Sequence, residues 1–471
     1  MSKKKINLIG FILFFILGVF IGLLRPFQPE LSSQGNFILM MLIITIGLWI
    51  FKPREIPFSI SSGLFMASLL ALKVPANIVF AGFSGNAVWT LISALFFGFV
   101  LAKTGLGKRI AYFGIKNTRL SYAGLLTMWA IIGVVLSILT PSITVRVVIV
   151  IPIALNCVNI CKLPKGSKGR SLVLLTAWAM ALIPGTGWLT GSLVGPILSG
   201  FFASTPGLGA IEFSDWAKVS LLPMTIISFL TVVGGYIVLR PSEPLNLSRD
   251  VFIEEYKKLG AMSNEEKITV AILVGTFTMF VTNSWHGIPD AATCLTAWFL
   301  LSLAGIIKGN EVSTGINWDL VIFVGTGMGF GAIFEYSGVS KWMSSILVDA
   351  LKPIAGSPWV FVYVVLILMF IWRFVDIAVF VPTKAIIVAI LPQVSEAYGI
   401  HPLVWVPLLC IAVNSFFLSY QNMFALVAEA NMAGEGWTPK HLAQYGTVYF
   451  VASMITMLVA IPYWISIGMF G

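Results

Sequence analysis

A short polar segment that can bind an anion interrupts a long apolar stretch in the first half of the chain. Residues 120–161 are almost wholly apolar, and at their centre lies the sequence TPSIT (residues 140–144), followed by the only charge of the stretch, Arg146. The proline breaks a helix at this point and frees backbone groups. Ser142 and Thr144 add hydroxyl groups, and a guanidinium can bind a carboxylate through two parallel hydrogen bonds. The segment is therefore a candidate anion site.

Arg146 could instead be a structural residue whose guanidinium satisfies carbonyl groups of the broken helix. An ionisable side chain within an apolar span costs roughly 2.5–3.5 kcal/mol on insertion scales, and residues of this kind are functional by default. We therefore favour anion binding for Arg146.

A second polar segment lies in the apolar stretch 357–398 and has the sequence PTK (residues 382–384). The ammonium of Lys384 could contact an anionic substrate or replace a bound cation electrostatically. In the alternative, Lys384 pairs with Asp376 and only holds the segment together. Arg373 and Asp376 are expected to form an ion pair, because residues three apart are neighbours on a helix.

Two further segments combine glycine or polar residues with apolar surroundings. The sequence GTGWLTG (185–191) follows Pro184, which favours an unwound helix, although glycines also permit close helix packing. The sequence LSYQN (418–422) is polar within an apolar run, and a hydrogen-bonded role in the core is an open alternative. Non-helical backbone at membrane depth needs cover from protein or a water-filled cavity, and transporters place binding sites at such breaks.

The stretches that position these segments are those of a membrane protein, because the chain is 58% hydrophobic and only 10% charged. Two stretches, 120–161 and 357–398, are too long for one crossing and are predicted to be re-entrant hairpins. We expect an all-α polytopic membrane protein with about 11 transmembrane helices and two re-entrant hairpins. The other apolar runs lie at 6–24, 36–51, 57–74, 84–102, 171–202, 218–239, 268–284, 289–307, 318–336, 402–428 and 446–470.

The basic residues follow the positive-inside rule, which accounts for the net charge of +10 without a nucleic-acid partner. Basic residues flank 120–161 on both sides, and the chain from Lys103 to Arg170 contains no acidic residue. A re-entrant hairpin keeps both basic clusters in the cytoplasm. The span count then predicts a multi-pass cell-membrane protein with a cytoplasmic N-terminus and an extracytoplasmic C-terminus.

An internal repeat relates the two halves. The sequences FGF and TGLGK (97–99 and 104–108) correspond to FGA and SGVSK (330–332 and 337–341), and the two hairpins correspond at a similar offset. An odd number of spans separates the copies, so the repeats are predicted to be inverted, as in many secondary transporters.

With these features the chain resembles the divalent anion:sodium symporter family, which transports di- and tricarboxylates or sulfate. The resemblance covers nearly the full length and implies a homodimer whose protomers each have a scaffold domain and a transport domain that moves like an elevator. The motifs that carry it are NAVW (86–89), TGLGKR (104–109), LGAMSNEEK (259–267), NWD (317–319), SFFLSYQ (415–421) and IPYW (461–464).

The resemblance also implies a division of the chain. We expect N-terminal scaffold helices in 1–83 and a cytoplasmic amphipathic segment with further scaffold helices in 240–317. The first repeat would be 84–239, with hairpin 120–161 and broken helix 171–202. The second would be 318–471, with hairpin 357–398 and broken helix 402–428.

In that family a Ser-Asn-Thr motif at each hairpin tip helps to bind substrate carboxylates and sodium, opposite a broken helix. Here the tips are SIT (142–144) and PTK (382–384), so neither middle residue is asparagine. The substrate-binding residues implied are Ser142, Thr144, Arg146, Thr186, Thr190, Thr383, Lys384 and Asn422. The ion-binding positions implied are Ser142, Ile143, Gly187, Gly191, Pro382 and Ser419, with sodium as the ion.

The predicted function is therefore secondary active transport of C4 or C5 dicarboxylates such as succinate, malate or fumarate. The spacing of Arg146 resembles the family's exchanger branch, so anion exchange is one mode. The alternative is a sodium-coupled symporter of dicarboxylate, citrate or sulfate. We expect no enzyme activity and no cofactor beyond sodium ions, because the sequence has no nucleotide-binding loop, metal cluster or paired nucleophile and base. A channel is disfavoured because no selectivity-filter motif is visible.

Overall fold

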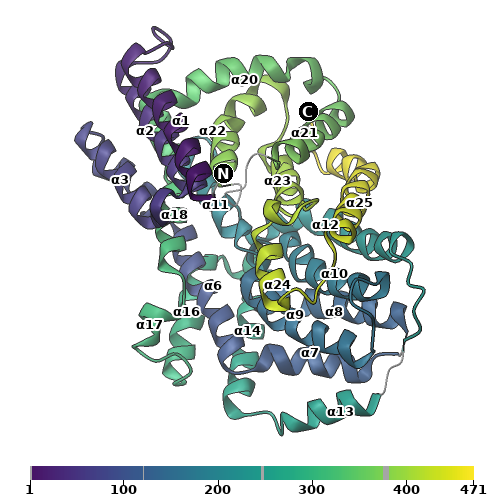
Figure 1. Cartoon of the computed structure of the whole chain (residues 1–471). Helices are drawn as coiled ribbons and strands as arrows, with labels where there is room; N and C mark the ends of the chain where they lie inside the picture. The colour runs from purple at the N-terminus through teal and green to yellow at the C-terminus, as the bar shows by residue number, and fades with distance from the viewer. Residues whose placement is uncertain (1–2, 120, 246–248, 375–380) are drawn as a thin grey trace.

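The computed structural model describes residues 3–119, 121–245, 249–374 and 381–471 (Figure 1). Within these ranges the regular structure is helical, and one isolated antiparallel bridge joins Ile400 to Phe470. The predicted all-α fold is confirmed.

Eight helical segments of the described chain are long and apolar enough to cross a membrane by length and composition. They are α1 (Lys3–Leu24), α2 (Ser33–Phe51), α6 (Asn86–Lys103), α8 (Tyr122–Leu139), α9 (Ile143–Ile160), α12 (Phe213–Val238), the consecutive α18 (Trp318–Met328) and α19 (Phe330–Ser337), and α25 (Pro439–Ser466). The shorter apolar helices are α3 (Phe58–Ala71), α11 (Val194–Ser204), α16 (Asp290–Leu303), α21 (Pro358–Trp372), α23 (Trp405–Val413) and α24 (Met423–Met432).

The other helices connect these elements or complete them. The longer ones are α7 (Leu106–Asn117), α10 (Lys168–Leu182), α13 (Arg249–Lys258), α14 (Asn264–Val281), α20 (Val339–Ala355) and α22 (Val381–Tyr398). The single-turn helices are α4 (Ala76–Val79), α5 (Ala81–Ser84), α15 (Asn283–His286) and α17 (Glu311–Thr314).

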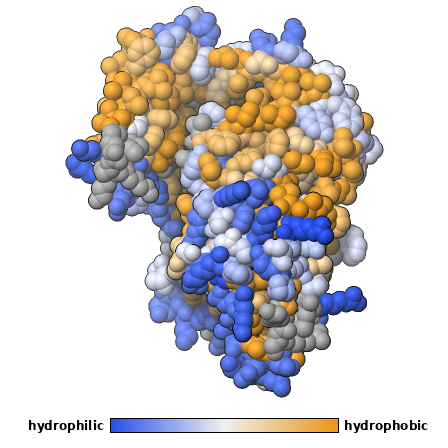
Figure 2. Space-filling model, turned by 45° about the vertical axis from the view of Figure 1, so that its right-hand side comes forward, coloured by the Kyte–Doolittle hydropathy of each residue, from blue (hydrophilic) through white to orange (hydrophobic). Residues whose placement is uncertain are grey.

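Large apolar side chains cover much of the outer surface. Figure 2 shows hydrophobic surface over the upper part of the molecule and a mostly hydrophilic lower end. Leu13 of α1, Ile237 of α12 and Leu303 of α16 are 62%, 67% and 71% exposed. Soluble monomers rarely expose contiguous apolar patches larger than a few hundred Å². A lipid bilayer around this surface would keep the exposed apolar side chains out of water. The apolar surface therefore agrees with the prediction of a multi-pass membrane protein.

Two helical stretches, each broken midway by a non-helical segment, lie at the centre of the molecule. The first consists of α10 and α11, and the second of α23 and α24. Every residue of α10 from Gly169 to Leu182 is buried, and so is every residue of α23. α10 packs against α8 and α9, whereas α23 packs against α21 and α12. Beyond each break the chain contacts the other hairpin, since α24 packs on α9 and α11 packs on α22. Both breaks are therefore enclosed by the two hairpins.

The first hairpin turns at a capped helix start. α8 ends at Leu139, and Thr140 adopts an extended conformation before Pro141. Ser142 caps α9, because its hydroxyl accepts a hydrogen bond from the Val145 amide at 3.4 Å, and its own amide donates to Thr140 Oγ1 at 3.1 Å. The polar residues at the tip thus satisfy part of the backbone that the break leaves free.

Two corresponding turns have the same geometry. Gly105 precedes α7 with φ 77° and ψ 3°, and Gly338 precedes α20 with φ 75° and ψ 3°. Glycine adopts this left-handed conformation without steric strain. Figure 1 shows α20 along the top of the molecule and α7 near the bottom. Copies of opposite orientation would have this arrangement, and the inverted repeat stays a prediction.

Candidate functional site

The tip of the first hairpin packs directly against α6. A Cβ atom at Gly98 would lie 2.8 Å from Ser142 Cβ and 2.9 Å from Thr140 Oγ1, so only glycine permits this approach. Ser142 is 5% exposed and Ile143 is 1% exposed, whereas Thr144 is half-buried. The predicted residues of this tip are therefore held in the protein interior.

Arg146 is the most unusual side chain in this region. It is fully buried, and none of its three guanidinium nitrogens has a hydrogen-bond partner among the described residues. A Cβ atom at Gly185 would lie 2.6 Å from Arg146 Nη1 and 2.8 Å from Nη2. Because Gly185 has no side chain, the guanidinium can lie directly beside the first broken helix.

The break between α10 and α11 spans residues 183–193. It contains two 3-10 turns, Pro184–Gly187 and Leu189–Gly191, joined by the extended residue Trp188. Trp188 Nε1 donates a hydrogen bond to Ser137 O on α8 at 3.2 Å. Trp216 Nε1 on α12 donates to Thr186 O at 3.0 Å. Indole groups thus fix the unwound backbone from two sides.

Not all predicted residues of this break face Arg146. The Thr186 hydroxyl donates to Ile183 O at 2.8 Å. A Cβ atom at Gly187 would lie 3.3 Å from Met224 Cβ, so Gly187 faces α12. Thr190 and Pro141 line a small internal cavity of about 10 Å³. Gly191 lies against Gly185 O and the Trp188 indole, where a side chain would collide with both.

Asn414 joins the two broken helices, and the sequence analysis did not select it. Its side-chain amide donates a hydrogen bond to Thr186 Oγ1 at 3.0 Å, and both residues are buried. An asparagine at the end of an otherwise apolar run was the available signal. Beside it, the Ser415 hydroxyl is buried and has no hydrogen-bond partner in the described ranges, as is also true of the Ser192 hydroxyl in the first break.

The second hairpin is described over 357–374 and from Val381 onward, so Asp376 and its predicted pairing lie outside the described residues. Pro382 is buried at the start of α22. Thr383 Oγ1 accepts a hydrogen bond from Trp372 Nε1 at 2.9 Å. Lys384 is fully buried and lies close enough to Cys410 of α23 for an electrostatic interaction. Its ammonium is therefore near the second broken helix.

Several polar residues of the second break have partners within the protein. Arg373 donates a hydrogen bond to Gln421 O, and Gln421 Oε1 accepts from the Phe417 and Leu418 amides at 2.8 Å each. Asn422 Oδ1 accepts from the Phe424 amide at 3.1 Å and caps α24.

Ser419 also has a protein partner, because its hydroxyl donates to Glu429 Oε1 at 2.6 Å. Glu429 was not selected from the sequence. Ser419, Gln421 and Asn422 therefore stabilise the break itself in this conformation.

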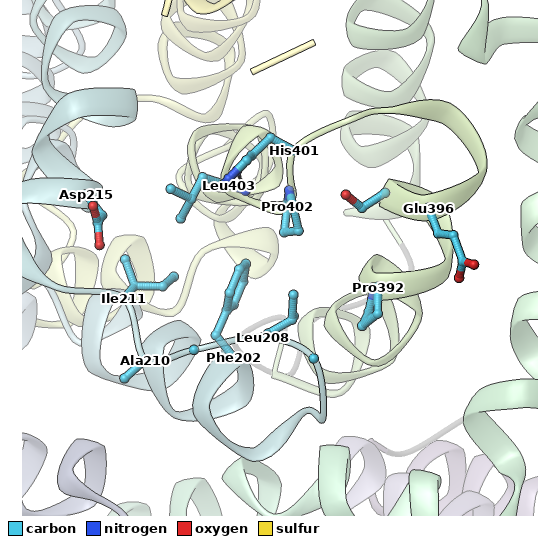
Figure 3. Close-up of a pocket in the computed structure, with 13 residues that line it drawn as sticks. Phe202, Leu208, Ala210, Ile211, Asp215, Pro392, Glu396, His401, Pro402 and Leu403 are labelled. Carbon is cyan, nitrogen blue, oxygen red and sulfur yellow. Dashed lines mark hydrogen bonds between the residues drawn. The ribbon is translucent and has the colours of Figure 1, made fainter. Parts of the chain in front are cut away.

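A sizeable cavity elsewhere in the described chain contains none of the predicted site residues. It has a volume of about 590 Å³ and lies between the loop 207–211, the end of α22 and the start of α23. Figure 3 shows His401 and Pro402 across from Leu208, with Asp215 and Glu396 at opposite ends. Burial and the charge of Lys218 lower the pKa of His401. Of the described residues that line this cavity, two carry carboxyl groups and none is a lysine or an arginine, so the cavity does not suit a dianion.

Comparison with known proteins gives a consistent result. The family described as "Sodium:sulfate symporter transmembrane region" matches residues 4–470. A relative named sodium-dependent dicarboxylate transporter SdcS, from Staphylococcus saprophyticus, is 25% identical over 88% of this chain and 85% of its own length. The L-tartrate/succinate antiporter of Escherichia coli O6:K15:H31 is 23% identical over 94% of this chain and 91% of its own. Dicarboxylate transporter 1, chloroplastic, of Arabidopsis thaliana is 22% identical over 85% of this chain and 72% of its own length.

A solved structure shares the fold. The Alcanivorax borkumensis YdaH transporter, whose crystal structure is described as having an unusual topology, aligns with a TM-score of 0.58 at 14% identity and covers 99% of both chains. This likeness concerns the fold alone.

Proposed function

The chain belongs to the sodium:sulfate symporter family, and from this membership together with Arg146 we propose that it is a secondary active transporter of divalent organic anions. The match confirms the resemblance to divalent anion:sodium symporters drawn from the sequence motifs. The family and the matched relatives are transporters, so the chain is a transporter and not an enzyme. We assign C4 or C5 dicarboxylates as the substrates.

The burial of Arg146 without a protein partner carries this proposal. An ion removed from water loses several kcal/mol of hydration, which protein structures offset with an opposite charge and hydrogen bonds. No such partner is present among the described residues. A substrate carboxylate between the hairpin tip and Gly185 would supply two parallel hydrogen bonds to the guanidinium. The hydroxyls of Ser142 and Thr144 and the freed amides of residues 183–193 would complete its shell.

Lys384 is proposed to meet the second carboxylate. Its buried ammonium on α22 lies near the second broken helix. In the predicted repeat, Lys384 belongs to the second hairpin and Arg146 to the first. Two fixed positive charges suit a dianion better than a monocarboxylate. We propose that Thr190 also contacts the substrate, whereas Thr186, Thr383, Asn422 and Ser419 position the surrounding backbone through the hydrogen bonds that they already make.

We further propose alternating access of the elevator type. The hairpins and broken helices would form a transport domain, and the helices of 1–83 and 240–317 would form a scaffold that also holds the homodimer contact. The runner-up function is sodium-coupled symport, in which the positions of Ile143, Gly187, Gly191 and Pro382 contribute backbone oxygens to sodium. The names of the matched relatives include both a sodium-dependent transporter and an antiporter.

Substrate-dependent stabilisation tests the proposed function. The purified protein should unfold at a higher temperature in the presence of succinate, malate or fumarate, because a ligand that binds only the folded state stabilises it by mass action. At a concentration about 100 times the Kd the gain is about 2.7 kcal/mol. A panel of dicarboxylates, citrate, sulfate and acetate should be measured with sodium and with choline. Stabilisation by sulfate but by no dicarboxylate would contradict the substrate class.

The proposed topology places the N-terminus in the cytoplasm and the C-terminus outside. Cysteine substitutions at the exposed residues Lys168 and Gly209 should therefore be labelled from opposite sides, Lys168→Cys from inside and Gly209→Cys from outside. The four native cysteines are buried and give a low background, which the unsubstituted protein controls for. Labelling of both positions from the same side would refute the proposed topology, in which the broken helix 171–202 crosses the membrane between them.

A further inference from the structure

A second group of carboxyl side chains lies away from the anion site, where α12 and α16 begin. Glu212 directly precedes α12, and Asp290 is the first residue of α16. The side-chain amide of Asn283 lies between them, 3.4 Å from Glu212 Oε2 and 3.4 Å from Asp290 Oδ1, and it also donates to Ile288 O at 2.9 Å. One amide group therefore serves two carboxyl groups that are remote in sequence.

The carboxyl group of Asp290 is buried, yet only one of its two oxygen atoms has a hydrogen-bond partner in the part of the chain that the structure describes. It is only 8% exposed, and its Oδ2 atom is inaccessible and has no hydrogen-bond partner among the described residues. Asp290 and Glu212 both line a cavity of about 100 Å³. Leu189 of the first broken helix lines the same cavity. The cavity at the carboxyl pair thus extends to the first broken helix, beside the proposed anion site.

No positive charge compensates this pair. None of the ion pairs in the described chain involves Glu212 or Asp290. The ring of the nearby His286 is directed to the backbone, because Nδ1 accepts a hydrogen bond from the Ile288 amide at 3.0 Å and Nε2 lies 3.0 Å from Met279 O. The other titratable groups close to the pair, Asp215 and Cys294, are acidic, and the residues that α6 and α11 contribute to the cavity are uncharged.

A metal ion is the less suitable ligand for this cavity. The described residues contain no group of three or more His, Cys, Asp or Glu side chains that could hold one. Two like charges in a poorly solvated place disfavour each other's ionisation, which a single bound proton relieves. Burial raises the pKa of Glu212, and the charge of Asp215 raises it further. The helix starts favour ionised carboxylates, but this effect is small and limited to the first turn.

We propose that Glu212 and Asp290 form a proton-binding site in which one of the two carboxyl groups holds a proton near neutral pH. The proton is taken from water and returned to it, and no other bond changes. Protonation of Asp290 gives its Oδ2 a hydrogen to donate and removes the repulsion between the carboxyl groups. The bound proton therefore holds the start of α12 to the start of α16, and its loss at higher pH weakens this contact. The site does not depend on the identity of the transported anion.

Thermal unfolding of the purified full-length protein against pH tests this site. A carboxyl group whose pKa is raised in the folded state stabilises the protein at low pH, and that stabilisation is lost as the pH rises through the folded-state pKa. Between about pH 5 and about pH 9, in choline buffer without substrate, the melting temperature of the wild type should fall by about 2 °C more than that of Asp290→Asn or Glu212→Gln. Glu396→Gln, an exposed carboxyl elsewhere, is the matched control and should behave like the wild type.

Infrared spectroscopy gives a readout that does not require a stable variant. The wild type near neutral pH should show the carbonyl stretch of a protonated, buried carboxylic acid, and this band should disappear as the pH rises. Its absence from the wild type would overturn the proposal. So would variants whose melting temperatures follow pH as the wild type does, or a wild type that sodium or calcium stabilises at high pH in a manner that Asp290→Asn abolishes.

Discussion

Arg146→Ala is expected to abolish dicarboxylate uptake without lowering the stability of the substrate-free protein. Truncation of one member of a buried charged pair weakens binding by about 2–5 kcal/mol, and each 1.4 kcal/mol is tenfold in affinity, so the substrate should bind roughly 30-fold to a few thousand-fold more weakly. The substrate-free variant loses a buried charge that has no partner in the described chain, which removes an unfavourable desolvation term. Its melting temperature should therefore equal or exceed that of the wild type.

Two further variants separate a binding role from a structural role. Arg146→Lys keeps the charge but loses the planar fork, so it should retain weak uptake. Arg109→Ala is the matched control, because Arg109 forms an ion pair with Glu266 at 2.7 Å. Its loss should lower the melting temperature and leave the stabilisation by succinate intact. Wild-type transport by Arg146→Ala, or a large loss of its stability, would show that Arg146 is structural.

Exchange of dicarboxylate across the membrane is expected to continue when choline replaces sodium on both sides. A sodium site needs several oxygen ligands, and Ile143 and Pro382 supply no side-chain oxygen at two hairpin positions where the resembled family has polar residues. The buried ammonium of Lys384 would also repel a cation bound near it, because like charges interact strongly where the dielectric is low. The fixed charge of Lys384 would instead neutralise part of the anion's charge, as a bound sodium ion would otherwise do. A carrier that needs no bound cation is expected to run as an exchanger rather than as a sodium symporter.

Counterflow in proteoliposomes preloaded with succinate measures this coupling. Undiminished uptake of labelled succinate in choline is the expected result, and Lys384→Met, which keeps the length but not the charge, should lose it. Lys384→Arg is the control that retains a positive charge. Uptake that collapses in choline and returns in proportion to added sodium would refute the exchange mode and favour the sodium-coupled alternative.

The sequence predicted the elements that composition and local chemistry determine. A proline beside small polar residues cannot continue an apolar helix, which is why the turn after Leu139 was located correctly. Apolar runs without charges predicted the all-α membrane fold, and the motifs identified the family. The guanidinium of Arg146 was a candidate because a lone charge within an apolar stretch is rarely without a role.

The contacts between distant segments could not be predicted in the same way. Asn414 bonds to Thr186, and Ser419 bonds to Glu429, only because the fold brings these side chains together. Asn422 and Thr383 matched positions of a family motif, yet their side chains already have partners in this conformation. No motif of the sequence marks Glu212 or Asp290, and only burial in three dimensions distinguishes them.

A structure determined by cryo-electron microscopy in the presence of succinate tests the central claim most directly. We expect density for one carboxylate within hydrogen-bond distance of both Nη atoms of Arg146, between the tip at Ser142 and the unwound segment at Gly185. The same density should be absent without succinate. Succinate bound in the cavity beside His401 instead, with Arg146 paired to a group of the protein, would contradict the assignment.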